Sequence, residues 1–301
     1  DGIVAGGGEL KNCFAVGKND RVILSQHIGD LKNYETLLFY REALDRFIEL
    51  FRIDPLLGVC DLHPDYESTK AIRALGVPVV EVQHHHAHVA SVLAEHGIEE
   101  TVIGVSFDGT GYGDDGAVWG GEFFLCDLTG YTRLSHLDYA ALPGGDKAAE
   151  EPWRMALSHL HRSLPTERTV ETVSRLTGVE AEKVSLLMRA IETGTGCPRT
   201  SSAGRLFDAV SSLTGLVQVS GFEAEAAMRL ESCAAEGLEL HGGTLPEPYP
   251  FSVDTVVRTE ELMAAVVEDV SRGADRRTVA LRFHRTLAEV IVAVARRARE
   301  A

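Results

Sequence analysis

The hydrophobic positions of this chain alternate between strand-like and helical spacing, and this predicts a mixed α/β fold. Short apolar stretches separated by turn residues predict three strands, which form an N-terminal β-meander. These are residues 3–8, 12–16 and 21–25. The following elements alternate in type: helix 35–51, strand 57–61, helix 67–75, strand 77–82 and helix 84–96. This β-α-β-α order predicts a parallel or mixed sheet with helices on its faces.

A second strand-rich segment begins at Thr101, so the strand-rich start of the chain occurs twice. Its expected strands are residues 101–107, 116–119, 121–127 and 131–137, and the glycines between them are typical of hairpins. Residues 150–237 are mostly helical in pattern, with a loop at 193–198; a Gly- and Pro-rich loop at 241–249 precedes amphipathic helices at 259–271 and 278–299. We therefore expect a first α/β lobe at residues 1–99. A second lobe, residues 100–301, would contain a helical insertion at about 150–240 and C-terminal helices.

Composition narrows the functional class. The chain has 301 residues, which is enough for a large core, and a net charge of −16, which argues against nucleic acid as the main partner. No apolar run is long enough for a membrane span, so we expect no membrane partner. The five cysteines form no C-x-x-C pair and are expected to be reduced thiols of a cytoplasmic protein. The chain lacks an initiator Met and a signal segment, which suggests a piece of a longer protein.

The candidate metal site lies at the junction of a predicted strand and helix. His84 and His88 are four residues apart, so both imidazoles lie on one face of a helix, where two rings can bind one metal ion. Asp108 follows the apolar run 102–107 and would add a carboxylate oxygen. The alternative for the histidines is a solvated or core cluster without metal.

The glycine-rich segment after Asp108 is the candidate phosphate site. Gly109, Thr110 and Gly111 are expected in a turn, where glycine lets backbone N–H groups approach an anion closely. A plain β-hairpin is the alternative, because neither a Walker A loop nor a dinucleotide fingerprint is present.

Three further segments contain candidate residues that could equally have a structural role. Lys11 follows three glycines and could neutralise a phosphate or carbamoyl oxygen, or simply lie on the surface. Ser202 to Asp208 opens a helix; Gly204 near its start and Asp208 one turn later could hold a ribose, or Asp208 could be solvated. His85 and His86 lie on other faces of their helix, and the sequence leaves open whether either or neither contacts the ligand; His85 is taken as the candidate.

Taken together, the ordered motifs of this chain resemble those of one family. They are Ser25–Leu31, Asp61–Tyr66, Val82–His88, Phe107–Gly113, Trp119–Glu122 and Ser202–Asp208. Their order resembles the Kae1-like carbamoyltransferase domain of the HypF proteins, which mature nickel–iron hydrogenases. The resemblance spans nearly the whole chain.

The resemblance implies a fold, a reaction and partners. The fold would be a two-lobed actin- or Hsp70-like (ASKHA) α/β fold that binds ATP-type nucleotide. A YrdC-like domain, absent here, would make carbamoyl-adenylate from carbamoyl phosphate and ATP. The Kae1-like domain would pass the carbamoyl group to the C-terminal cysteine thiol of the partner HypE, and the product would become a cyanide ligand of the hydrogenase iron.

The resemblance also implies roles for individual residues. His84, His88 and Asp108 would bind a divalent metal, iron or zinc. Gly109, Thr110 and Gly111 would bind the phosphates and Gly204 and Asp208 the ribose of ATP, AMP or carbamoyl-adenylate. Lys11 and His85 are the candidate catalytic residues.

Two departures from the family pattern bear on the site. Ala224 stands where glycine is common, which affects the ribose contact. The family also continues past the helix that ends near Ala301 into a Gly-Gly nucleotide loop and a last metal-ligand Asp, so we expect a C-terminal truncation with incomplete metal and adenosine sites.

Three other functions compete with carbamoyl transfer to a thiol. A tRNA threonylcarbamoyl-type transferase is disfavoured by the acidic charge. An actin-like ATPase or sugar kinase is disfavoured by the histidine pair, because such sites hold Mg²⁺ through carboxylates and water. A non-catalytic lobe that binds only HypE or nucleotide is the remaining alternative.

Overall fold

The computed structural model describes residues 1–300 and divides into two compact units. The first unit contains Asp1–His88 together with Tyr112–Asp114, and the second contains Val89–Gly111 and the chain from Asp115 onward. We expected a division near residue 99. It falls instead at His88, inside a helix, and a short later segment returns to the first unit.

A mixed sheet forms the first unit. Its strands are β1 (Ile3–Ala5), β2 (Ala15–Lys18), β3 (Arg21–Leu24), β4 (Leu57–Asp61) and β5 (Val79–Val82), in the order β3-β2-β1-β4-β5. The first three strands pair antiparallel, whereas β1, β4 and β5 pair in parallel. The predicted β-meander followed by parallel strands is therefore confirmed, with the first strand shorter than expected.

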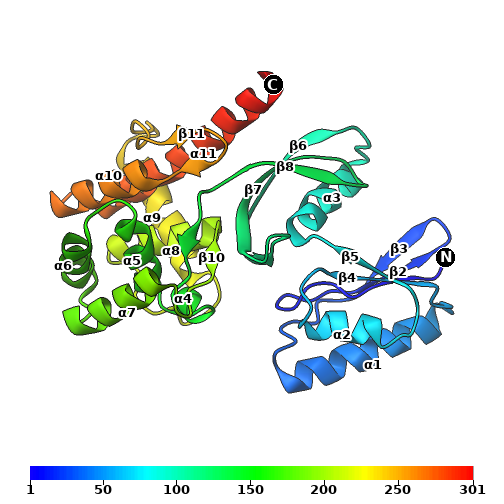
Figure 1. The fold of residues 1–301 in the computed structure, drawn as a ribbon. Helices are drawn as coiled ribbons and strands as arrows, with labels where there is room; N and C mark the ends of the chain where they lie inside the picture. Colours follow the sequence, from blue (N-terminus) through cyan, green and yellow to red (C-terminus); the bar gives the residue numbers. More distant parts are fainter. Residues whose placement is uncertain (301) are drawn as a thin grey trace. The chain divides into compact units, whose positions relative to one another are not determined.

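Two helices of the first unit, α1 (Tyr34–Leu50) and α2 (Glu67–Arg73), lie on the same side of this sheet (Figure 1). Asn33 caps α1, because its side chain accepts a hydrogen bond of 3.0 Å from the Thr36 N–H. The fully buried Ile72 of α2 packs so closely on the sheet that a Cβ at Gly58 would lie 2.5 Å from it. Glycine in β4 thus allows the helix to approach the strand.

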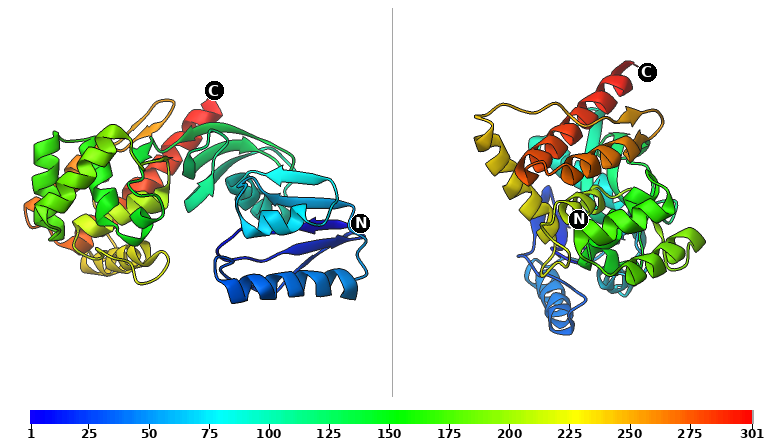
Figure 2. Two further views of the ribbon diagram at one scale, coloured as in Figure 1. Left: turned by 60° about the horizontal axis from the view of Figure 1, so that its bottom comes forward. Right: turned by 90° about the vertical axis from the view of Figure 1, so that its left-hand side faces the viewer.

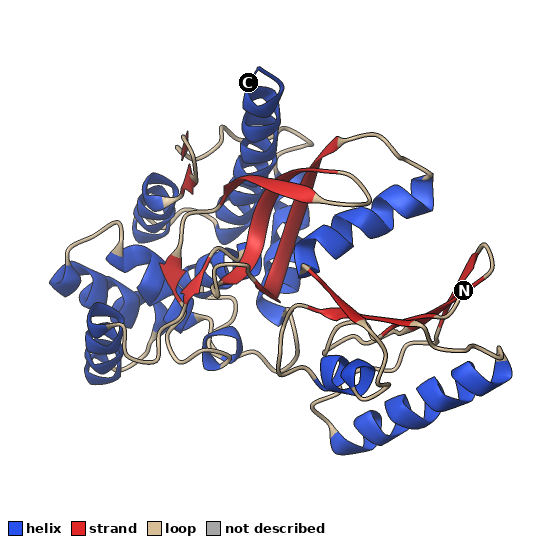
Figure 3. Cartoon of the chain, turned by 45° about the vertical axis from the view of Figure 1, so that its right-hand side comes forward, coloured by secondary structure: helices blue, strands red, loops and turns tan. Residues whose placement is uncertain are grey.

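The sheet of the second unit is built on a long hairpin. Its strands are β6 (Val102–Tyr112), β7 (Val118–Cys126), β8 (Tyr131–His136), β9 (Ala140–Ala141) and β10 (Arg199–Thr200). The central strand β7 pairs with β6, β8 and β10, and β10 pairs with β9. Helix α3 (His84–His96) lies along this sheet with its part after His88 (Figure 3). There Val89 and Leu93 join a core with Phe124.

Two predictions for this hairpin were wrong. The glycines after Asp108 were expected in a turn, but β6 continues to Tyr112 and the turn follows it. Strands were expected at 116–119 and 121–127, but β7 is continuous through Gly120 and Gly121. Glycine was taken as a strand break, whereas here Gly120 has a φ of +155° and lets β6 pass closely, because a Cβ would lie 2.5 Å from Asp108 O.

Helices make up most of the second unit. They are α4 (Lys147–Glu150), α5 (Trp153–His161), α6 (Thr166–Thr177), α7 (Ala181–Thr193), α8 (Ala203–Leu213), α9 (Glu225–Leu240), α10 (Glu260–Ser271) and α11 (Arg276–Glu300). The core around them includes the fully buried Met155, Leu206 and Phe283. Helix α11, red in Figure 2, packs along α9, where Gly237 allows a close approach to the Arg277 carbonyl.

The helical insertion, the loop at 241–249 and the two C-terminal helices were predicted correctly. The short strands β9 and β10 and the hairpin of β11 (Ser252–Val253) with β12 (Val257–Arg258) were not predicted. Among the described residues, no helix combines the length and apolar character needed to cross a membrane.

Candidate functional site

The start of α3 is fixed by Gln83. Its side-chain oxygen accepts hydrogen bonds from the backbone N–H groups of His85 (2.6 Å) and His86 (3.0 Å), which would otherwise lack partners at a helix N-terminus. Its amide nitrogen donates to Tyr112 O at 3.1 Å. The first turn of the histidine helix is therefore tied to the returning segment of the first unit.

His84 and His88 face one another on this helix, as their spacing predicted. Their Nε2 atoms are 3.2 Å apart. His84 Nδ1 lies 2.7 Å from Oδ2 of Asp61, at the end of β4. The carboxylate holds the His84 proton on Nδ1, which leaves the Nε2 lone pair directed at His88.

Asp61 was not among the predicted site residues. It is nearly buried, and its other oxygen accepts a hydrogen bond of 2.8 Å from the His63 N–H. A carboxylate behind a histidine ring is the usual arrangement around a metal ligand, because it orients the ring and increases its basicity. The sequence did contain a signal for this role. Asp61 ends strand β4, and β4 pairs with β5, the strand that directly precedes the histidines.

Asp108 lies in the second unit, on β6. One of its carboxylate oxygens accepts a hydrogen bond of 2.6 Å from the Gly109 N–H, and the side chain is half-buried. The predicted ligands offer two imidazole nitrogens and one carboxylate oxygen, and donors of these types suit zinc or ferrous iron better than magnesium. The residue types therefore fit the metal that the resemblance implies.

The N-terminus of α8 packs directly on β6. The Ser202 hydroxyl caps the helix by accepting from the Arg205 N–H at 3.2 Å. The same hydroxyl lies within donating distance of Asp108 O (2.7 Å) and Gly109 O (2.9 Å). A Cβ at Gly204 would lie 2.8 Å from the Gly109 Cα, so only glycine allows this contact.

The predicted nucleotide residues therefore gather around one place in the second unit. Gly109 and Gly204 are in contact, and Thr110 is exposed on β6 between Gly109 and Gly111. A helix N-terminus beside a glycine-rich strand presents backbone N–H groups, an arrangement that suits an anion such as phosphate.

Asp208 lies on α8, but its carboxylate is buried rather than solvated. Its Oδ2 is 3.0 Å from Arg205 Nε, although the orientation of the two groups forms no hydrogen bond. Burial raises the pKa of Asp208 to about 6, against the opposing effect of the Arg205 charge. Such a carboxylate is destabilising where it stands, which is common for functional groups.

The two candidate catalytic residues lie in the first unit. Lys11 is exposed and follows a glycine loop that the Asn12 side chain holds by donating to Gly6 O (2.9 Å) and Gly8 O (2.6 Å). A Cβ at Gly8 would lie 3.9 Å from the His84 ring, so this loop runs beside the histidine. His85 is fully buried, with Nδ1 3.3 Å from the Gln83 side-chain nitrogen.

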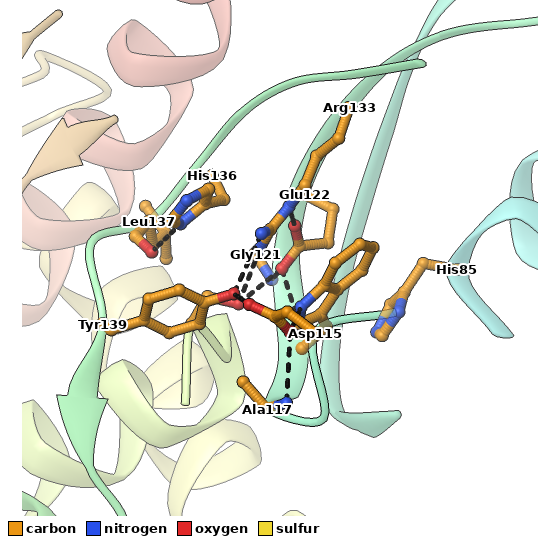
Figure 4. A network of polar contacts seen from close by, with 12 residues as sticks. His85, Asp115, Ala117, Gly121, Glu122, Arg133, His136, Leu137 and Tyr139 are labelled. Atoms are coloured by element: carbon orange, nitrogen blue, oxygen red, sulfur yellow. Dashed lines mark hydrogen bonds and ion pairs between the residues drawn. The ribbon is translucent and has the colours of Figure 1, made fainter. Parts of the chain in front are cut away.

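A polar network of the second unit was not predicted (Figure 4). It joins the buried Glu122 of β7 to Arg133 of β8, and Arg133 donates to the Tyr139 hydroxyl at 2.9 Å. Tyr139 in turn donates to Asp115 at 2.6 Å. Partial burial alone would raise the pKa of Asp115, but hydrogen bonds from Tyr139, Ala117 and Trp119 outweigh it and lower that pKa.

Comparison with known families agrees with the resemblance seen in the motifs. Residues 1–95 match the model of the HypF Kae1-like domain. Residues 104–301 match the model described as carbamoyltransferase, Kae1-like domain, second subdomain.

Named relatives are similar along most of the chain. Carbamoyltransferase HypF2 of Cupriavidus necator is 41% identical over 261 residues, which cover 85% of this chain and 32% of that protein. A carbamoyltransferase HypF homolog of the same organism is 38% identical over 304 residues, covering 96% of this chain and 75% of that protein. The chain thus spans about a third of the length of the first of these relatives.

Solved structures extend the similarity to the fold. Full-length HypF in a phosphate- and nucleotide-bound form matches 99% of this chain and 46% of that chain, with a TM-score of 0.91 and 35% identity. HypF of T. kodakarensis matches 99% of this chain and 40% of that chain, with a TM-score of 0.90 and 34% identity. The expected Kae1-like α/β fold is confirmed.

Proposed function

Since the chain belongs to the family of HypF Kae1-like carbamoyltransferase domains, we propose that it transfers a carbamoyl group from carbamoyl-adenylate to the C-terminal cysteine thiol of a HypE-type maturation protein. The product would become a cyanide ligand of a nickel–iron hydrogenase. The observation that carries the proposal is the His84–His88 pair with Asp61 behind it. This pair supports a metal-dependent transferase over an actin-like ATPase, whose Mg²⁺ is held by oxygen atoms.

His84, His88 and Asp108 are proposed to hold a divalent iron or zinc ion. Bound there, the ion would supply a positive charge that stabilises negative charge on the carbamoyl or phosphate oxygens. Asp61 keeps the Nε2 lone pair of His84 directed towards His88, and Gln83 fixes the first turn of the helix that carries both rings.

Carbamoyl-adenylate is proposed to bind through its AMP portion to the second unit. Its phosphate would lie on Gly109, Thr110 and Gly111 and at the N-terminus of α8. Its ribose would contact Gly204 and Asp208. The phosphate- and nucleotide-bound structure of a HypF protein supports nucleotide binding in this family.

The proposed reaction conserves atoms and charge as follows. A partner thiolate attacks the carbamoyl carbon, a C–S bond forms, and the C–O bond to the phosphate breaks with its electron pair leaving on AMP. The thiol proton passes to a base or to water. Lys11 is proposed to offset charge on the leaving phosphate, and the five cysteines of this chain take no part. The expected ligand contact of His85 is not retained, because its side chain is fully buried and presents no surface to a substrate.

The test uses a full-length protein that carries this domain and its YrdC-like domain. Carbamoyl phosphate, ATP and either HypE or tRNA are supplied, and each acceptor is analysed by mass spectrometry. A carbamoyl mass increase on HypE, lost when its terminal cysteine is replaced, is expected. Modification of tRNA without HypE would assign the chain to the threonylcarbamoyl branch instead.

A further inference from the structure

Glu122 is a fully buried carboxylate at the centre of the second unit's sheet. One oxygen accepts hydrogen bonds from Gly120 N and Gly121 N, both at 3.1 Å, and from Ser201 Oγ at 2.5 Å. The other accepts from Arg133 Nε at 2.7 Å (Figure 4). Burying a carboxylate is costly unless it is paired and hydrogen-bonded, and this one is satisfied by four donors from three segments.

Two of the three segments that Glu122 joins, at Gly120 and at Ser201, lie on either side of β6 at Asp108. On one side, Gly120 lies against Asp108 O, where a Cβ would approach to 2.5 Å. On the other side, Ser202, the residue after Ser201, binds the carbonyl groups of Asp108 and Gly109. A single carboxylate therefore holds both flanks of the strand that carries these two residues.

Arg133, the charged partner of Glu122, is itself fixed. Its guanidinium carbon lies 3.8 Å from the centroid of the Trp119 ring, and it donates to the Tyr139 hydroxyl. Trp119 and Tyr139 both donate to Asp115, at 2.8 and 2.6 Å. The network leaves the Glu122 side chain little freedom to move away from its donors.

We infer that Glu122 is a positioning residue, which holds the Asp108–Gly109 segment and the α8 N-terminus in register for ligand binding. It lies behind the backbone of that segment and is not itself a ligand contact. The inference rests on the proposed function for what binds at Gly109 and Gly204. The order of the two segments, however, can be measured by amide hydrogen exchange without any ligand.

The test replaces the pair and not the carboxylate alone, since a partly buried Arg133 without its carboxylate would destabilise the fold. In Glu122→Met/Arg133→Met the volume is kept and both charges are removed. Amide hydrogen exchange is followed in residues 108–111 and 203–206, and AMP affinity is measured by calorimetry. We expect at least tenfold faster exchange in both segments and at least tenfold weaker AMP binding.

Two further variants decide between positioning and general loss of stability. Arg162→Met/Glu260→Met removes another partly buried pair of the same unit, with 2.5 Å between charged atoms, and should leave exchange in these segments unchanged. Glu122→Gln/Arg133→Met restores an acceptor for the glycine N–H groups and should recover most of the protection. If residues 108–111 and 203–206 exchange at the same rate in Glu122→Met/Arg133→Met and in the control Arg162→Met/Glu260→Met, the inference is overturned. If wild-type protein binds no AMP, the proposed nucleotide site fails, while the exchange data still decide the role of Glu122.

Discussion

At the scale of single residues, the site depends on carboxylates that act on other groups. Asp61 sets the tautomer of His84, and Glu122 holds backbone N–H groups. Neither was singled out from the sequence as a site residue, because Asp61 pairs with His84, 23 positions away, and Glu122 joins its own strand to Ser201, 79 positions away. Residue spacing reveals only pairs on one element, such as His84 and His88.

The role of Asp61 can be tested through metal binding. In Asp61→Asn the side chain no longer favours the proton on His84 Nδ1 as strongly, so the Nε2 lone pair is less available. Affinity for zinc should fall by about 10- to 100-fold, and in His84→Ala/His88→Ala bound metal should disappear. Elemental analysis and competition with a chelator measure both, and unchanged affinity in Asp61→Asn would contradict the assigned role.

The buried Asp208 predicts an unusual pH dependence. Its pKa is raised from 3.8 to about 6 in the folded state, so the folded protein binds more protons than the unfolded chain between these values. Its contribution to stability is therefore present at low pH and is lost as pH rises through about 6. Asp208→Asn should stabilise the protein at pH 7.5 by on the order of 2–3 kcal/mol and change little at pH 4.

Denaturant unfolding at the two pH values tests this prediction. AMP binding measured on the same variant shows whether the stability gain accompanies a loss of ligand affinity, as expected for a destabilised functional carboxylate. A destabilised Asp208→Asn at pH 7.5 would show that the Arg205 charge outweighs burial.

At the scale of elements, apolar periodicity predicted the long helices and the first parallel strands well. Helix α3 and strand β4 have the predicted bounds. In α3 the buried residues His85, Val89 and Leu93 recur every four positions, which is a helical period. The two-residue strands β9 to β12 were missed, since such short strands depend on neighbours distant in the sequence and not on a local pattern. The same limit explains why β7 was predicted as two strands. Gly120 does not break it but allows β6 to pack closely, a contact that the local sequence does not show.

Helix α9 begins at a strained residue. Ala224 has a left-handed backbone with φ 62° and ψ 14°. This conformation is unfavourable for any residue with a Cβ, so Ala224→Gly should stabilise the protein by about 0.5–1 kcal/mol. In the matched control Ala235→Gly, at an exposed position in the same helix, stability should fall by about 1 kcal/mol. Opposite signs in urea unfolding are the expected result.

Helix α5 contains a histidine that lowers the stability of the folded protein at acid pH. His159 is almost completely buried, and both ring nitrogens lack hydrogen-bond partners. Burial, with a smaller effect of Arg162, lowers its pKa from 6.5 to about 3. The unfolded chain thus takes up a proton near pH 6.5 and the folded state does not, so stability present above pH 6.5 is lost as pH falls towards 3.

His159→Leu should therefore flatten the acid limb of the stability curve. Below pH 6 the difference between the variant and wild type should grow by about 1.4 kcal/mol per pH unit. At pH 8, where the ring is neutral in both states, the same comparison serves as the control. Parallel curves from pH 8 to 4.5 would mean that His159 gains a proton or a partner in the folded protein.

At the scale of the whole molecule, the two units have separate hydrophobic cores. One core contains Val4, Phe14, Tyr40 and Ile72, and the larger one is built from the helices around α5 and α8. Separate cores in one chain favour unfolding in more than one step, so a single unfolding free energy does not describe such a protein. This bears on every variant above, because each is expected to affect the unit that contains it.

Calorimetry of the chain should therefore show two transitions that respond to different substitutions. Ile72→Ala in the first unit and Leu206→Ala in the second both delete a fully buried side chain, at a cost of about 2–5 kcal/mol. We expect Ile72→Ala to lower one transition and Leu206→Ala the other, and Asp208→Asn at pH 7.5 to raise only the transition that Leu206→Ala lowers. If each variant shifted a single common transition, the two cores would unfold as one cooperative unit. The predicted metal and nucleotide residues would then lose their folded structure in the same step.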